Sequence, residues 1–97
     1  MSAEQKAALE RLLAIASRDT GQSRRVADFL LAWWNAGSCG GFDLTTMWGC
    51  DTAIVEDMVT VFAYVGHNSH YPDALGLGYG PRFEAIVREW RPELVRS

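Results

Sequence analysis

The chain has 97 residues, of which 48% are hydrophobic and 22% are charged, and its net charge is −3. This length fits one domain, and the composition is that of a folded protein, not of a disordered one. The longest apolar run is far shorter than the roughly 20 residues that a membrane-spanning helix needs. The first residues, MSAEQKAALE, lack the charged-then-apolar layout of a secretion signal. We therefore expect a cytoplasmic protein whose two cysteines are reduced thiols.

The first two expected helices cover residues 3–17 and 23–36. In the first, apolar residues recur at i, i+3, i+4 and i+7, and Ser2 with Gln5 fits a capping box at its start. The second is apolar around most of its circumference, which is typical of a helix that is packed on several sides, so we place it at the centre of the fold. Gly37 follows as the expected C′ residue, because glycine adopts the left-handed conformation without steric cost.

A short helical turn is expected at 44–48, with Asp43 as its cap, and the third long helix at 52–65. The N-cap of this helix is expected at Asp51 or at the residue after it. Many residues of the helix are β-branched, so a buried strand at 58–65 is the competing interpretation. Helical spacing and length favour the helix.

A glycine-rich loop is expected at 66–81, before a last helix that begins near Pro81. Pro92 ends this helix, because the residue before a proline disfavours helical angles. The sequence therefore predicts one all-α domain over residues 1–97, a compact bundle of four main helices with a short turn and a long loop.

The stretch WWNAGSCGG, residues 33–41, has the composition of a ligand-binding loop. Phosphate-binding loops, however, place their glycines before a helix, where backbone N–H groups face the anion. Here the glycines follow a helix, and no Lys or Arg occurs in residues 37–80. We interpret the stretch as a helix end, with Trp33 in the core and Trp34 in the core or on a partner surface.

Zinc-type ligands occur at four positions, namely Cys39, Cys50, His67 and His70. Structural zinc sites usually pair cysteines two to four residues apart, and these cysteines are separated by ten residues. The competing interpretation is a buried thiol at Cys50, a loop thiol at Cys39 and two solvated histidines. Cys39 with a histidine is also the only candidate nucleophile pair, and nothing signals an oxyanion hole. We expect no cofactor and no enzymatic activity, and a zinc site stays an alternative.

Anion and nucleic-acid sites are weakly indicated. The stretch LGLGYGP at 75–81 precedes a helix that carries Arg82, but its spacing matches neither the dinucleotide fingerprint nor the P-loop. Arg18, Arg24 and Arg25 form one small basic cluster, offset by nearby acidic residues. Nucleic-acid-binding domains usually carry a larger basic face, so we expect no direct binding of nucleic acid.

The most informative predicted surface is acidic. Residues 37–80 carry five carboxylates and no Lys or Arg. Such a surface can steer a basic partner and compete with nucleic-acid phosphate, although it is also what a solvated face looks like. The candidate partner-binding residues combine these carboxylates with two aromatic side chains: Asp43, Asp51, Glu56, Asp57, Tyr64, Asp73 and Trp34.

Several stretches carry a resemblance to a known family, above all QSRRVADFLLAWWNAG, GGFDLT, the corner at Trp48–Asp51 and the terminal IVREWRPEL. Over most of its length the chain resembles a family of short uncharacterised proteins encoded on bacterial plasmids and integrative elements. The resemblance implies an accessory role on a mobile element and assigns no catalytic residue.

We therefore expect a non-enzymatic protein-binding module that recognises a host protein with a basic surface. Its sharper form is an inhibitor of a nucleic-acid-handling defence complex, of the anti-CRISPR or anti-restriction type. Two alternatives stay open. One is a homodimer that buries Trp34 or Trp48, and the other is a small ligand- or zinc-binding domain.

Overall fold

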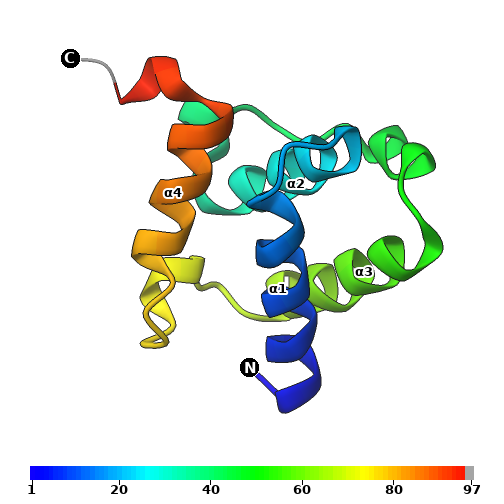
Figure 1. The fold of residues 1–97 in the computed structure, drawn as a ribbon. Coiled ribbons are helices and arrows are strands. Elements are labelled where there is room, and N and C mark those ends of the chain that lie inside the picture. The colour runs from blue at the N-terminus through cyan, green and yellow to red at the C-terminus, as the bar shows by residue number, and fades with distance from the viewer. Residues whose placement is uncertain (96–97) are drawn as a thin grey trace.

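The computed structural model describes residues 1–95, which form four α-helices and three short 3-10 helices (Figure 1). The elements in chain order are α1 (Ala3–Ala16), α2 (Gly21–Cys39), η1 (Leu44–Gly49), α3 (Thr52–His67), η2 (Pro72–Ala74), α4 (Gly80–Trp90) and η3 (Pro92–Leu94). The all-α prediction is confirmed, and the described residues contain no strand. None of their helices combines the length and apolar character needed to cross a membrane.

The helices pack around one apolar core. In Figure 1, α1 crosses in front of α2 and α3, and it packs against both of them. Helix α2 also contacts α4 and η1, which agrees with its predicted central place, whereas α2 and α3 touch each other only sparsely. The largest fully buried side chains come from all four helices and the segment before α4: Leu9, Leu12, Leu13, Val26, Leu30, Leu31, Met58, Val61, Pro72, Tyr79, Phe83 and Ile86.

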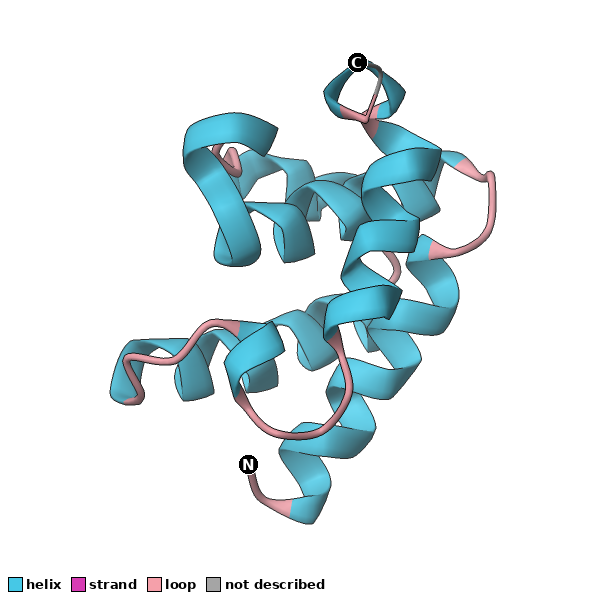
Figure 2. Ribbon diagram, turned by 90° about the vertical axis from the view of Figure 1, so that its left-hand side faces the viewer, coloured by secondary structure: helices cyan, strands magenta, loops and turns pink. Residues whose placement is uncertain are grey.

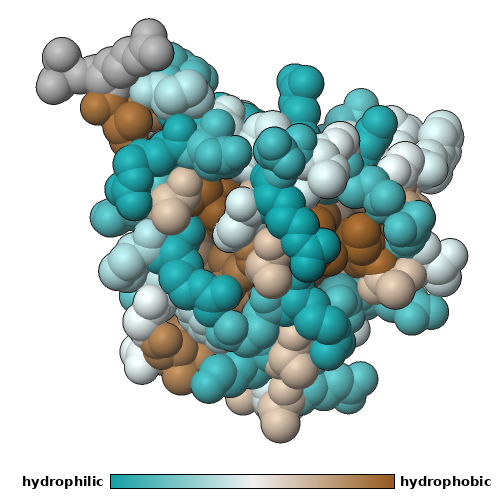
Figure 3. Space-filling model, viewed as in Figure 1, coloured by the Kyte–Doolittle hydropathy of each residue, from teal (hydrophilic) through white to brown (hydrophobic). Residues whose placement is uncertain are grey.

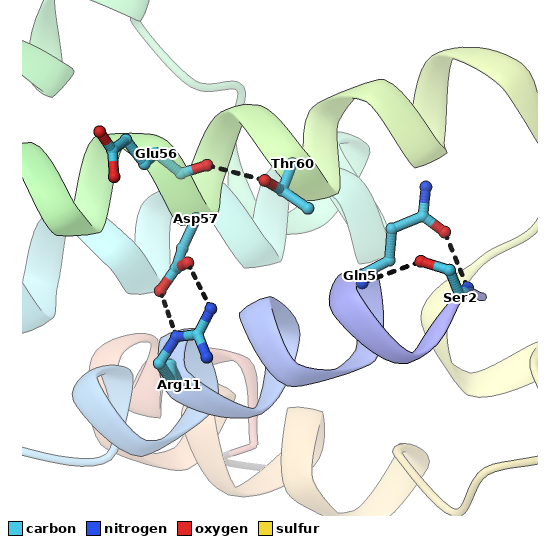
Figure 4. Close-up of polar contacts among 6 residues, drawn as sticks. All are labelled: Ser2, Gln5, Arg11, Glu56, Asp57 and Thr60. Carbon is cyan, nitrogen blue, oxygen red and sulfur yellow. Dashed lines mark hydrogen bonds and ion pairs between the residues drawn. The ribbon is translucent and has the colours of Figure 1, made fainter.

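Local capping explains where several elements begin. The Ser2 hydroxyl accepts from the Gln5 backbone N–H at 3.1 Å, and the Gln5 side chain accepts from the Ser2 N–H at 2.9 Å, so the predicted capping box is confirmed (Figure 4). Asp43 caps η1 as predicted, because its carboxylate accepts from the Thr45 N–H at 2.9 Å. Asp51 is the N-cap residue of α3 but makes no side-chain capping bond.

The predicted end of the second helix is wrong. Helix α2 passes Gly37 and ends at Cys39, and the residue with positive φ is Gly40, at +96°. A kink at Asn35, with φ −161° and ψ 74°, separates the last turn from the rest of the helix. The Asn35 side chain accepts from the Ser38 N–H at 3.2 Å and so caps this extra turn.

The predicted loop at 66–81 contains η2 and is tied to α2. The indole N–H of Trp33 donates to the His70 carbonyl at 3.0 Å. At the other end of the molecule, the Trp90 indole donates to the Ala16 carbonyl at 2.8 Å, which joins the end of α4 to the end of α1. These two bonds fix the long loop and α4 against the first two helices.

Candidate functional site

Large apolar side chains are unusually exposed between η1 and the segment after α3. Those that are more than half exposed in this part of the chain are Leu44 (63%), Trp48 (86%), Val59 (55%), Phe62 (57%) and Tyr71 (63%). Single exposed apolar residues are ordinary, but a contiguous group of them indicates an interaction surface. The face that carries α1 and α4 is mainly hydrophilic, with apolar patches between the polar side chains and at the left edge of the view (Figure 3).

Three of the elements enclose an open apolar groove, which we call the α2–α3 groove. Figure 2 shows the backbone of the helices from the side. The groove has a volume of about 210 Å³, and its lining comes from α2, from the segment that leads into η1 and from α3: Phe29, Ala32, Trp33, Phe42, Leu44, Phe62 and Val65. None of these side chains carries a charge.

The groove exists because α3 packs mainly on α1. The side of α3 that faces the core buries Ile54, Met58 and Val61. A second apolar stripe, Val55, Val59 and Phe62, recurs at i, i+4 and i+7 and is half-buried or exposed. It has no helix over it in residues 1–95, because α2 meets α3 only sparsely. A helix with two apolar sides normally packs on both of them, so α3 has one side left for another contact.

A second hollow continues from the groove. It has a volume of about 310 Å³ and shares Trp33 and Val65 with the α2–α3 groove. Its other walls are polar or amphipathic and follow α3: Asn68, Ser69, His70 and Tyr71. Trp33 therefore lines both hollows. Its ring packs edge-on against the buried Phe83 of α4, with ring centroids 6.1 Å apart.

The predicted acidic face on α3 is only partly present. Asp57 points toward α1 and makes a bidentate ion pair with Arg11, with both N–O distances at 2.9 Å (Figure 4). This pairing raises the pKa of Arg11, chiefly through the hydrogen bond to the carboxylate. Tyr64 is only 6% exposed and its ring lies edge-on to Trp33, so its prediction as a surface residue is wrong. Glu56 is exposed and lines, with Asp57, a hollow between α3 and α1 to which Arg11 and Arg18 also contribute.

The remaining predicted carboxylates are exposed but dispersed. Asp43 stands between two groove residues in the sequence, and its bonds to the side chain and backbone of Thr45 lower its pKa. Asp51 pairs with Gln22, whose side chain accepts from the Asp51 N–H at 2.7 Å. Asp73 is exposed on η2. The structure therefore places Asp43 next in the chain to two groove residues, and it does not gather all the predicted acidic residues into one cluster.

Trp34 lies on a different side of α2 from the groove. It is half-buried, and its ring is tilted against Phe83 with centroids 6.0 Å apart. It lines a separate hollow near the end of α4, together with Arg88 and Leu94. Trp34 therefore serves partly as a core residue, which is one of the two roles that the sequence left open.

The thiols occupy the opposite environments to those expected. Cys39 is buried at the end of α2, where Arg91 donates to its carbonyl at 3.0 Å, and Cys50 is only half-buried. Burial raises the pKa of both thiols, which makes them poor nucleophiles near neutral pH. His67 and His70 are exposed. Across residues 1–95, no group of three or more His, Cys, Asp or Glu side chains is arranged to hold a metal ion.

The basic cluster predicted at the start of the second helix is also divided, because Arg18 lines the hollow between α1 and α3, apart from Arg24 and Arg25. Arg24 and Arg25 line a shallow hollow with Asp28 and Thr46. The Arg25 guanidinium packs on Gly49, so closely that a Cβ there would lie 2.5 Å from it. Arg25 therefore packs against η1, and it does not line the α2–α3 groove.

Comparison with known proteins bears out one part of the resemblance seen in the sequence, namely that the family is uncharacterised. No curated protein matches the chain, and no solved structure matches it. A model of one protein family matches residues 6–91, which include all four α-helices almost completely. The chain therefore belongs to DUF7673, a family of unknown function.

Proposed function

We propose that this chain is a non-enzymatic protein-binding module and that the α2–α3 groove is its contact surface. The observation that carries the proposal is the uncharged, open groove beside exposed Leu44, Val59 and Phe62. Protein interfaces have apolar centres that are enriched in aromatic residues and depleted in charge, with polar residues at the rim. The lining of the groove has the composition of such a centre, with four aromatic residues and no charge.

The size of the groove suits the anchor side chains of a partner. A cavity of about 150 Å³ is enough to enclose a benzene molecule. A groove of about 210 Å³ therefore accommodates one or two apolar side chains. Binding sites of this kind concentrate most of their free energy in a few anchors that fill such pockets.

In its sharper form, the proposal makes the chain an accessory protein of a bacterial mobile element that acts in the cytoplasm on a host protein complex. The anti-CRISPR or anti-restriction type of inhibitor is the specific form. Its support is the absence of Lys and Arg from residues 37–80, which include α3 and most of the apolar surface. A basic surface that handles nucleic acid attracts a protein region with this charge.

The proposal is tested by affinity capture from bacterial lysate with three tagged proteins, each treated with nuclease. These are the unaltered chain, Phe62→Ala in the groove, and Leu77→Ala as the matched control, since Leu77 is exposed (43%) and does not line the groove. We expect a stoichiometric protein that the Phe62→Ala variant loses and the Leu77→Ala variant keeps. Equal capture by all three proteins would refute the role of the groove.

A homodimer is the second candidate, and the 86% exposure of Trp48 favours it. Trp34 no longer does, because it is half-buried against α4. Sedimentation of the purified chain distinguishes the candidates: a dimer that Trp48→Ala dissociates supports self-association, whereas a monomer at micromolar concentration removes it.

A further inference from the structure

We draw no further inference here: the strongest candidate, the occupant of the open apolar α2–α3 groove, belongs to the site already described, and nothing in residues 1–95 shows what covers that groove.

Discussion

The same substitution at two phenylalanines of the groove should separate a binding residue from a core residue. Phe29 and Phe62 both line the α2–α3 groove, but Phe29 is 6% exposed and Phe62 is 57% exposed. Phe29 also packs edge-on against Phe42, with ring centroids 5.3 Å apart. We therefore expect Phe29→Ala to damage the fold and Phe62→Ala to damage partner binding while the fold persists.

The magnitudes follow from the buried area. Replacing an enclosed phenylalanine by alanine lowers the free energy of unfolding by about 3–5 kcal/mol, which is the expectation for Phe29. A fully buried phenylalanine removes about 200 Å² of surface from water, and each Å² of apolar surface removed contributes about 25 cal/mol of stability. Less than half of Phe62 is enclosed, and alanine retains part of that contact, so Phe62→Ala should lower the free energy of unfolding by about 1 kcal/mol. Burying the exposed remainder in a complex is worth at most about 3 kcal/mol, or about 100-fold in affinity.

Urea unfolding followed by tryptophan fluorescence measures the first quantity, and titration with the captured partner measures the second. The expected pattern is a small stability loss with a large affinity loss for Phe62→Ala, and a large stability loss for Phe29→Ala. Comparable stability losses for the two variants would show that Phe62 is a core residue and that the groove is closed in solution. The interpretation of α3 as a helix with an unpartnered side would then be refuted.

Two further predictions concern charge and pH. Glu56→Lys should change the free energy of unfolding by less than about 0.5 kcal/mol, because the side chain is exposed. Asp57→Lys should lower it by about 1 kcal/mol or more, because the new cation would repel Arg11. Thermal denaturation measures both effects, and equal effects would contradict the observed pairing of Asp57 with Arg11. Burial, assisted by the nearby Glu10 carboxylate, raises the pKa of Tyr79 to about 12. The unfolded chain therefore loses this proton first, so stability should decline between about pH 10 and pH 12. Tyr79→Phe should reduce that decline and leave stability at pH 7 unchanged or slightly higher, because the buried hydroxyl has no hydrogen-bond partner within residues 1–95. Urea titrations across this pH range measure the difference, and an identical decline in both proteins would refute the assignment.

Much of the fold could be predicted from the sequence because its signals are local. Periodicity located the four helices, and the pairs Ser2 with Gln5 and Asp43 with Thr45 made the expected capping bonds. The end of α2 could not be located in the same way. Gly37 carries a helix-ending signal, but capping by Asn35 adds one more turn, and the chain reverses at Gly40.

The candidate site depended on packing between helices, which periodicity does not specify. The sequence showed that apolar residues cover nearly half of the third helix, and this was the available signal for Phe62 and Val59. Which apolar side would face the core was not encoded locally. Asp57 shows the same limit: it shares a helix with Glu56, but its partner Arg11 is 46 residues away in the sequence.

The α2–α3 groove is preformed, and this bears on how tightly it can bind. Trp33 is held by its bond to the His70 carbonyl and by ring contacts to Phe83, and the Asp43 cap orders the start of η1 beside Leu44. Walls fixed in this way lose little conformational entropy when a partner arrives, so more of the gain from apolar burial appears as affinity. The exposed end of Phe62 is then the part of the groove that a partner orders. If the groove is the binding surface, changes that loosen its fixed walls should weaken binding even where they touch no partner atom.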